Sequence, residues 1–370
     1  MPTPLLRLLL CPLHWGLGHA TRSLPLADAL RAAAAEVGRD VAIHWASDGD
    51  AIALLRRERP DDSHHELPTY GVRYPTRSAL LNMALSGPRM LAAIGREARA
   101  VRELHARYDF DLVISDNRYG CRVPGVRNLF VTHQVHLPIG GLAGRASQTL
   151  HNAWIGGFDE VVIPDYPTAP RLAGEMSVPP PRMAATYLGP VSRFAQALPT
   201  DGYEDNRVVC LLSGPEPART ALEHLLYERL DRPALLIRGT TRPAERRPPA
   251  HVEVRDLLVA GDLRAVLAQA PLLITRPGYT TVMDLAVLGL GAVFVPTPGQ
   301  PEQERLGRSL AAGGRGVTVA QDELRVPGVL ANALAHLMSM TSGSPTGGLA
   351  PKPHPDALHA WARREVSLFA

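Results

Sequence analysis

The sequence of 370 residues contains a single lysine, Lys352, and its other basic side chains are arginines and histidines. P-loop kinases, Schiff-base aldolases and pyridoxal-phosphate enzymes each require a lysine in their core motif. The near absence of lysine therefore argues against all three classes of enzyme.

Cysteine is also scarce. Cys11, Cys121 and Cys210 are far apart and odd in number, so they indicate neither a disulfide framework nor a zinc cluster. This use of cysteine is typical of a protein in a reducing compartment, and we expect a cytoplasmic location.

The chain lacks strong net charge and long apolar runs. Its formal net charge of +3 is too small to indicate a nucleic-acid partner by itself. The apolar run near the N-terminus is interrupted by Arg7 and is too short to span a membrane, and no small-residue cleavage site follows a charged leader. We expect this run to form the first buried strand.

What the chain does have is length and a regular alternation of apolar segments. It exceeds one ordinary domain and suits two α/β domains of somewhat under about 200 residues each. Strand-like and helix-like segments alternate in both halves, which favours parallel sheets covered by helices. We expect strands at Leu5–Cys11, Val41–Ala46, Leu112–Ser115, Leu129–Thr132 and Glu160–Ile163, and then at Arg207–Leu212, Ala234–Ile237, Leu272–Ile274 and Ala292–Val295.

These segments predict a division of the chain. Residues 1–190 form a first domain and residues 206–340 a second, with a hinge at 191–205 that contains proline and glycine. Residues 341–355, rich in glycine, serine and proline, are expected to be a flexible linker. The final stretch, 356–370, has the pattern of a helix.

A glycine-rich turn that ends in a histidine is the clearest sign of function. Gly16-Leu17-Gly18-His19 follows the first apolar run and opens the alanine-rich stretch 20–35. A strand, a glycine turn and a helix in this order place backbone N–H groups and a positive helix end beside one imidazole. This suits proton chemistry on a phosphorylated ligand, although a tight turn capped by His19 would give the same pattern.

A second motif lies in the other half of the chain. Residues 275–284, which read Thr-Arg-Pro-Gly-Tyr-Thr-Thr-Val-Met-Asp, follow an apolar strand and begin another helix. The next strand leads into residues 296–304, which read Pro-Thr-Pro-Gly-Gln-Pro-Glu-Gln-Glu. Ligands of open parallel sheets lie beyond the carboxyl ends of the strands, so we expect both segments at a binding site.

Together these segments resemble the GT-B glycosyltransferases, and most closely the bacterial group that transfers N-acetylglucosamine to a lipid-linked muramyl peptide. That group has an early Gly-x-Gly-Gly-His turn, and late in the chain Ser-Arg-x-Gly-Ala-x-Thr with a downstream acid and Gln-Gln. The resemblance covers most of the chain in order. The run Gly-x-Gly-His-Ala-Thr-Arg, which ends here at Arg22, is also similar to sugar-nucleotide hydrolases of the same fold.

The resemblance implies an α/β fold with two Rossmann-like domains facing across a cleft, the second of which holds a nucleotide-diphosphate sugar. It also implies that the C-terminal helix crosses back to the first domain. No cofactor is expected, because the nucleotide sugar, with UDP as its nucleotide, is a substrate.

On the donor side, the resemblance places Ser213 and Gly214 where the family has a Gly-Gly-Ser turn at the diphosphate. Arg193 stands where an arginine of the family reaches the same phosphates. A helix N-cap for Ser213 and a surface position for Arg193 are the plainer alternatives. The donor-site residues Gly16, Gly18, Arg276, Gly278, Tyr279 and Thr280 belong to the two turns described above.

The remaining donor contacts that the resemblance implies concern the nucleoside and the sugar. Asp284 replaces a longer glutamate that accepts the ribose hydroxyls, and the backbone near Leu258 lies where the family reads the uracil. Gln303 matches a glutamine that binds the transferred sugar. Glu304 replaces a second glutamine and can accept but not donate hydrogen bonds, so the identity of the sugar stays open.

On the acceptor side, two loops follow strands and are expected beside His19. Their candidate acceptor-binding residues are Asn117, His133 and Gln134. Asp116 could orient the His19 ring or take the acceptor proton itself, and a simple turn cap is the plainer alternative. Because Thr132 and His133 stand where the family has histidine and glutamate, we expect a different acceptor.

Two Asp-x-Asp sequences, at residues 48–50 and 109–111, match the pattern by which another glycosyltransferase fold holds a divalent metal. The first is more simply a helix N-cap, and the second lies at the amino-terminal edge of a strand. We therefore expect no metal.

Residues 70–108 are basic and amphipathic, with arginines among leucines and methionines. A packed helix with a solvated face is the simpler explanation. The alternative is peripheral contact with the inner face of a membrane, where a lipid-linked acceptor would lie.

The sequence therefore favours a metal-independent, inverting glycosyltransferase whose partners are a nucleotide sugar and an acceptor. His19 would be the general base, with Asp116 in the same catalytic network. Two alternatives stay open. A sugar-nucleotide hydrolase would use His19 to activate water, and a non-catalytic sugar-nucleotide-binding protein would lack a base near the sugar.

Overall fold

The computed structural model describes residues 5–14, 17–70, 79–194, 207–214, 216–240, 242–258, 260–270, 272–341 and 355–369. Gly16, most of the expected hinge 191–205 and most of the expected linker 341–355 lie outside these ranges. The chain divides into two compact units. Unit 1 comprises Met1–Val191 and His354–Ala370, and unit 2 comprises Ser192–Pro353.

In the described part of unit 1, seven parallel strands form one sheet in the order β3-β2-β1-β4-β5-β6-β7. The strands are β1 (Leu6–Pro12), β2 (Val41–Ser47), β3 (Ser63–Glu66), β4 (Leu112–Asp116), β5 (Arg127–Val131), β6 (Glu160–Ile163) and β7 (Ala185–Tyr187). The helices are α1 (Gly18–Glu36), α2 (Gly49–Glu58), α3 (Ala79–Tyr108), α4 (Gly141–Ile155) and α10 (Pro355–Ser367). A short 3₁₀ turn, η1, spans Gly174–Ser177.

The central strands of unit 1 are covered on both faces. Leu9, Cys11 and Val113 pack with Val101 of α3 in one buried cluster, while the alternate residue Leu10 is buried on the opposite face. A parallel sheet covered on both faces needs nearly continuous apolar strands, and β1 has that composition. This explains why the first apolar run forms a buried strand, as expected.

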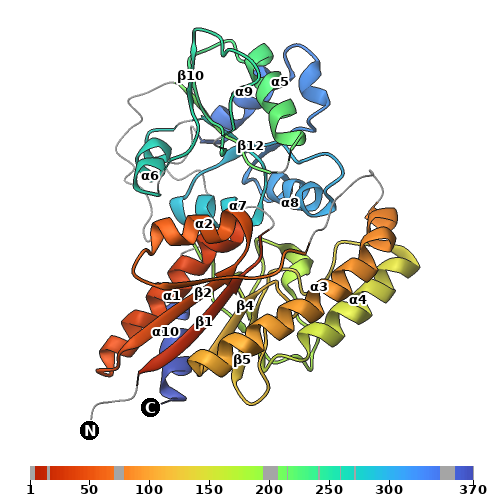
Figure 1. Cartoon of the computed structure of the whole chain (residues 1–370). Coiled ribbons are helices and arrows are strands. Elements are labelled where there is room, and N and C mark those ends of the chain that lie inside the picture. Colours follow the sequence, from red (N-terminus) through yellow and green to blue (C-terminus); the bar gives the residue numbers. More distant parts are fainter. Residues whose placement is uncertain are drawn as a thin grey trace. The chain divides into compact units, whose positions relative to one another are not determined.

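The C-terminal helix α10 is part of unit 1 and lies beside α1 (Figure 1). Arg363 donates to Glu36 of α1 at 2.6 Å. Glu365 of α10 is fully buried and accepts from Arg127 at the start of β5 at 3.0 Å. These ion pairs join the end of the chain to its first helix and its central sheet.

In the described part of unit 2, six parallel strands form a second sheet in the order β10-β9-β8-β11-β12-β13. The strands are β8 (Val208–Leu211), β9 (Ala234–Ile237), β10 (Val252–Arg255), β11 (Leu272–Thr275), β12 (Ala292–Phe294) and β13 (Gly316–Thr318). The helices are α5 (Ala218–Arg229), α6 (Ala260–Ala268), α7 (Tyr279–Leu288), α8 (Pro301–Ala312) and α9 (Val329–Thr341), with a 3₁₀ turn η2 at Glu323–Arg325. Its core joins strand residues such as Cys210 and Ile274 to Leu226 of α5 and Leu334 of α9.

Two parallel sheets covered by helices confirm the expected α/β fold class, but four strands were not predicted. All four are outermost strands, β3 and β7 in the sheet of unit 1 and β10 and β13 in the sheet of unit 2. They have three or four residues each, and β3 reads Ser-His-His-Glu with its side chains partly exposed. Such short polar edge strands lack the apolar run that marks a central strand.

Candidate active site

The register of β1 and β4 places a small charged cluster at the carboxyl edge of the sheet in unit 1. Pro12 pairs with Asp116, and the Leu13 amide donates to the Asp116 carbonyl at 3.0 Å. His19 and Arg22 lie three residues apart on α1, which puts them on one helix face. His19 Nδ1 is 2.9 Å from Asp116 Oδ1, and Arg22 donates through Nε to Asp116 Oδ2 at 2.6 Å. Arg22 also donates through Nη2 to Oδ1.

Asp116 is buried and ionised. Burial by itself would raise its pKa, but the Arg22 guanidinium and the His19 ring more than offset this and lower the pKa of Asp116 to about 2. The bidentate arginine fixes both carboxylate oxygens in place. Asp116 is therefore a permanent acceptor at neutral pH.

His19 Nδ1 lies 2.9 Å from Asp116 Oδ1 and 3.0 Å from Arg22 Nη2. A carboxylate can only accept and a guanidinium can only donate, so the two contacts call for opposite tautomers of the ring. In the tautomer that bonds to Asp116, Nδ1 carries the hydrogen and the lone pair is on Nε2. The side chain of His19 is 16% exposed, whereas that of Asp116 is 2% exposed, so the ring separates the carboxylate from solvent. An imidazole held in this way can accept a proton from a bound molecule through Nε2.

Arg22 also connects this cluster to the loop after β5. Its Nη1 lies 3.3 Å from Nδ1 of His133, which is buried. Arginine can only donate, so His133 accepts through Nδ1. Gln134 follows, and its backbone N–H donates to the Thr132 hydroxyl at 3.0 Å. The structure thus brings together His19, Asp116 and His133, and Arg22 is the residue that joins them.

A buried ion pair fixes the loop that follows β4. Asn117 has a left-handed φ of 59°, which turns the chain sharply after Asp116. Arg118 and Glu97 of α3 are both fully buried and paired with each other, and Arg118 also donates to Asp48 at 2.8 Å. Glu97 accepts from the Gly120 amide at 2.9 Å. These contacts fix the loop that presents Asp116 and Asn117.

His151 of α4 ties the two acceptor-side loops to each other. Its Nε2 donates to the Gln134 carbonyl at 2.9 Å, because a carbonyl can only accept. Its Nδ1 therefore accepts from the Tyr119 hydroxyl at 2.9 Å. Burial lowers the pKa of His151 to about 4, so the ring is neutral and this arrangement holds at neutral pH.

In unit 2, the loops after β8 and β12 meet around a glycine turn. Gly214 has a left-handed φ of 101°, and Ser213 beside it is partly exposed. A Cβ atom placed on Gly214 would lie 3.6 Å from the hydroxyl oxygen of Thr297, which is buried. The turn and Thr297 therefore border the same space at the carboxyl edge of this sheet.

Arg276 is fully buried beneath this edge. Its Nη1 donates to the carbonyls of Val295 and Pro296, each at 2.9 Å, and its Nη2 donates to Ala218 O at 2.8 Å and Gln321 Oε1 at 2.6 Å. The sequence analysis expected the side chain at the donor. These hydrogen bonds fix the loops around Arg276, while its Nε has no hydrogen-bond partner in the described part of the chain, so the expected contact with the donor stays a prediction.

Asp284 and Arg193 lie next to each other. The Ser192 hydroxyl donates to Asp284 Oδ1 at 2.5 Å, and Arg193 Nε is 3.6 Å from Oδ2 without a hydrogen bond between them. Burial raises the pKa of Asp284 to about 6, although Arg193 and Ser192 both act to lower it. The expected roles of Asp284 at a ribose and Arg193 at a phosphate stay predictions.

Gln303 and Glu304 both bind the loop that precedes α8. Gln303 Oε1 accepts from the Thr297 amide at 2.8 Å, and Glu304 Oε1 accepts from the Gly299 amide at 3.3 Å. Among the other donor-side candidates, Leu258 follows β10 and is partly buried, and Gly18 begins α1 in unit 1. Gly278, Tyr279 and Thr280 form the start of α7.

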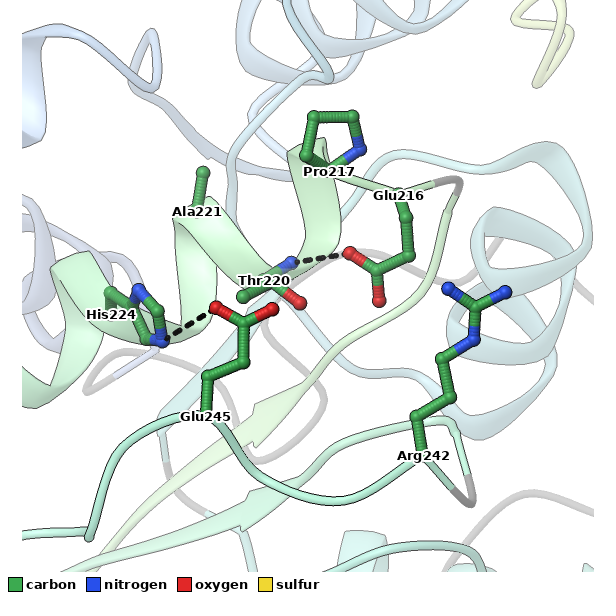
Figure 2. A pocket seen from close by; sticks show the side chains of 7 residues that line it. All are labelled: Glu216, Pro217, Thr220, Ala221, His224, Arg242 and Glu245. Atoms are coloured by element: carbon green, nitrogen blue, oxygen red, sulfur yellow. Dashed lines mark hydrogen bonds and ion pairs between the residues drawn. The ribbon is translucent and has the colours of Figure 1, made fainter.

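A pocket of 310 Å³ lies against α5 (Figure 2). Figure 2 shows Glu216 and Glu245 facing into it from opposite sides, with His224 Nε2 4.0 Å from Glu245 Oε2. The pocket is lined by Glu216, Pro217, Thr220, Ala221, His224, Arg242 and Glu245. Two carboxylates in its wall disfavour a diphosphate there.

One aspartate of each Asp-x-Asp sequence has a partner within unit 1. Asp48 is bound by Arg118, and Asp111 accepts from the Arg7 amide at 2.8 Å. Among the residues that the structure describes, no group of three or more histidine, cysteine, aspartate or glutamate side chains is arranged to hold a metal ion. In the same part of the chain, no helix is long and apolar enough to cross a membrane.

Comparison with known proteins finds a family match within the second half of the chain. Residues 257–347 match the model of the glycosyltransferase family 28 C-terminal domain. This range contains Arg276, Asp284 and Gln303, which carry much of the late motif.

Over a longer range the chain is similar to bacterial UDP-N-acetylglucosamine–N-acetylmuramyl-(pentapeptide) pyrophosphoryl-undecaprenol N-acetylglucosamine transferases. It is 27% identical to the enzyme of Mycobacterium leprae over 95% of this chain and 86% of that relative. It is 26% identical to the enzyme of Pasteurella multocida over 47% of this chain, where it spans 50% of the relative's length. These relatives confirm the resemblance that the motifs indicated.

Solved structures show the same fold at low sequence identity. The spinosyn rhamnosyltransferase SpnG in complex with thymidine diphosphate has a TM-score of 0.65 and 15% identity, over 98% of this chain and 96% of that one. MurG of Acinetobacter baumannii has a TM-score of 0.51 and 15% identity, over 99% of both chains. The chain therefore has the GT-B fold of these structures.

Proposed function

We propose that this chain moves a sugar from a nucleotide-diphosphate sugar, with UDP as the nucleotide, to a hydroxyl group of an acceptor. The observation that carries the proposal is the contact between His19 and the ionised Asp116, in a chain whose other half matches a glycosyltransferase domain. The names of the relatives include UDP-N-acetylglucosamine, and the SpnG structure contains a nucleoside diphosphate. Both support this class of donor.

In the proposed reaction, Nε2 of His19 takes the proton of the acceptor hydroxyl while its oxygen attacks the anomeric carbon. The bond from that carbon to the phosphate oxygen breaks, and the nucleoside diphosphate leaves with the electron pair. Asp116 stabilises the imidazolium that forms. A single displacement of this kind inverts the configuration at the anomeric carbon.

On the donor side, we propose that fixed groups of unit 2 stabilise the leaving diphosphate without a metal ion. Ser213 and the backbone of Gly214 lie at the end of β8, and α5 and α7 begin at the same edge of the sheet. Helix N-termini and backbone amides favour negative charge. Asn117, His133 and Gln134 are the proposed acceptor contacts, because their loops adjoin Asp116.

The test combines binding with product analysis. Calorimetric titration with UDP, TDP and GDP should show the tightest binding for UDP. Incubation with UDP-sugars should then release UDP at a rate that depends on an added acceptor, and a product that contains both sugar and acceptor should form. Failure to bind any nucleoside diphosphate would contradict the proposal.

The same assay separates the alternatives. The dyad of His19 and Asp116 could activate water instead of an acceptor hydroxyl, in which case free sugar would form at a catalytic rate without any acceptor. Tight UDP binding with no turnover under any condition would instead indicate a sugar-nucleotide-binding protein.

We further propose that the protein acts in the cytoplasm and contacts the inner face of the membrane through residues 70–108. Residues 71–78 and the side chains of residues 79–88 lie outside the described part of the chain. In the rest of α3, Arg89, Arg96, Arg99 and Leu91 are exposed. Cosedimentation with anionic but not with neutral vesicles, reduced when Arg96 and Arg99 become glutamate, would support this contact. Equal sedimentation of the variant would contradict it.

A further inference from the structure

Thr297 is a buried residue whose hydroxyl has no hydrogen-bond partner in the described part of the chain. Its exposure is 3%, and neither a carbonyl nor a carboxylate accepts from its Oγ1. Buried hydroxyls are nearly always hydrogen-bonded, and one without a partner loses free energy. A group kept in this state in the free protein indicates a partner that arrives with a ligand.

The backbone around Thr297 is held by side chains on both sides. Arg276 binds the carbonyls of Val295 and Pro296, the two residues before it, each at 2.9 Å. Gln303 accepts from the Thr297 amide itself at 2.8 Å. These contacts fix the backbone that carries the hydroxyl and leave the hydroxyl itself without a partner in the described part of the chain. Arg276 and Gln303 are therefore positioning residues for Thr297.

The hydroxyl faces the glycine turn after β8. At Gly214, with φ at 101°, an added Cβ would lie 3.6 Å from Oγ1 of Thr297, and apart from the glycine's chain neighbours no other atom of the described residues would come within 4 Å. The backbone of the turn and the Thr297 hydroxyl thus border the same space. The helices α5 and α7, which follow β8 and β11, both begin at this edge of the sheet.

The charge around this space favours an anion. Helix N-termini carry partial positive charge, and the buried Arg276 guanidinium lies beneath the same loops. Of the carboxylates near this space, Glu216 is bound by Arg219 at 2.7 Å and Glu304 accepts from the Gly299 amide at 3.3 Å. A hydroxyl that needs an acceptor, in a region of positive potential, suits a phosphate oxygen.

We propose that the Thr297 hydroxyl donates a hydrogen bond to a diphosphate oxygen of the bound donor. This inference rests on the proposed function and adds a contact to its donor site. Arg276 through Nη1 and Gln303 through Oε1 hold the backbone on both sides of the Thr297 hydroxyl, and we expect them to act on the donor through it.

The test is a pair of substitutions with matched shapes. Thr297→Val removes the hydroxyl and keeps the volume, whereas Thr297→Ser keeps the hydroxyl. Calorimetry should show that Thr297→Val weakens UDP binding about tenfold, as expected for one hydrogen bond to a charged group. Thr297→Ser should bind UDP nearly as the wild type does, and uridine, which has no phosphate, should bind all three proteins alike.

The stability of the free protein separates this role from a structural one. Because the hydroxyl has no partner in the free protein, Thr297→Val should be at least as stable as the wild type in urea. A variant that bound UDP with unchanged affinity, or that lost uridine as strongly as UDP, would overturn the inference.

Inorganic pyrophosphate distinguishes this inference from the proposed function. Binding of pyrophosphate that depends on the Thr297 hydroxyl, in a protein that does not bind UDP, would support the subsite and contradict the nucleotide. If UDP binds Thr297→Val as tightly as it binds the wild type, the result would support a nucleotide-diphosphate donor and contradict the contact with Thr297.

Discussion

Each unit has a buried aspartate beside an arginine, and the pKa values of the two carboxyl groups are shifted in opposite directions. In unit 1, Asp116 accepts from both Nε and Nη2 of Arg22, and its pKa falls to about 2. In unit 2, Arg193 comes no closer than 3.6 Å to Asp284, and the pKa of Asp284 rises to about 6. Burial raises the pKa of both groups, so the close charges of Arg22 and His19, together with their hydrogen bonds, decide the difference.

The opposite pKa shifts of Asp116 and Asp284 suit different roles. A carboxylate that stays ionised can hold the His19 ring in one tautomer through a whole catalytic cycle. A buried carboxylate whose charge the protein stabilises only in part gains free energy when a ligand supplies hydrogen-bond donors, such as the hydroxyls of a ribose. The comparison predicts that unit 1 carries the chemistry and that unit 2 carries the affinity for the donor.

The largest expected effect concerns His19. Replacing it with alanine removes the group that takes the acceptor proton and should lower turnover by about a hundredfold or more. Donor affinity, measured by titration with UDP, should change much less, because the proposed donor contacts belong to unit 2. Steady-state kinetics and calorimetry on the same variant test both parts. Full activity in His19→Ala would direct attention to His133 or to Asp116 itself as the base.

The two aspartates should also change stability with pH in opposite ways. Asp284 has a raised pKa in the folded chain, so its stabilising effect is present below its ordinary pKa of 3.8 and is lost as the pH rises through about 6. Relative to Asp284→Asn, the wild type should lose up to about 3 kcal/mol of unfolding free energy between about pH 4 and pH 7.

Asp116 should behave in the reverse sense. Its pKa is lowered, so its contribution is present above 3.8 and is lost as the pH falls through about 2. Relative to Asp116→Asn, the wild type should lose about 2 kcal/mol over that lower range. Urea unfolding at a series of pH values measures both differences. Parallel curves for wild type and Asp284→Asn would show that Asp284 does not titrate near pH 6.

The sequence could predict the fold class and the main residues of each motif, since these depend on local pattern. Apolar runs mark central strands, and a glycine turn before an alanine-rich helix marks the position of His19. Asp116 was expected near His19 because both follow strands, and parallel strands end at one edge. This reasoning could not predict that the side chains of His19 and Asp116 are in direct contact, at 2.9 Å.

Residues that act through distant partners could not be predicted. Arg22 is separated by 94 residues from Asp116, although its position three residues after His19 on a helix was an available signal. Nothing in the sequence distinguishes Arg276, which is buried, from an arginine that faces a ligand. The unpartnered hydroxyl of Thr297 is likewise a property of the folded chain alone, because it depends on which acceptors the neighbouring loops supply.

A smaller effect is expected at His151, which joins the two acceptor-side loops. His151→Phe keeps an aromatic ring but removes the hydrogen bonds to Gln134 and Tyr119. Because misplacement of binding groups weakens their contacts, the acceptor KM should rise roughly tenfold while UDP affinity stays the same. A merely structural role would lower stability without this selective change. Equal KM values for the acceptor in the variant and the wild type would contradict the positioning role.

Chelation is expected to have the smallest effect. This expectation depends on which groups stabilise the negative charge of the leaving diphosphate. That charge must be stabilised either by a divalent ion on carboxylates or by fixed donors of the protein. The proposed donor edge of unit 2 supplies Ser213, Thr297 and two helix N-termini, whereas in unit 1 Asp48 is already bound by Arg118. Fixed donors need no ion, so sugar transfer should continue in excess EDTA at the rate seen without it. Complete loss of activity on chelation, with recovery on addition of magnesium or manganese, would overturn this assignment and bring Asp48 and Asp50 back into the site.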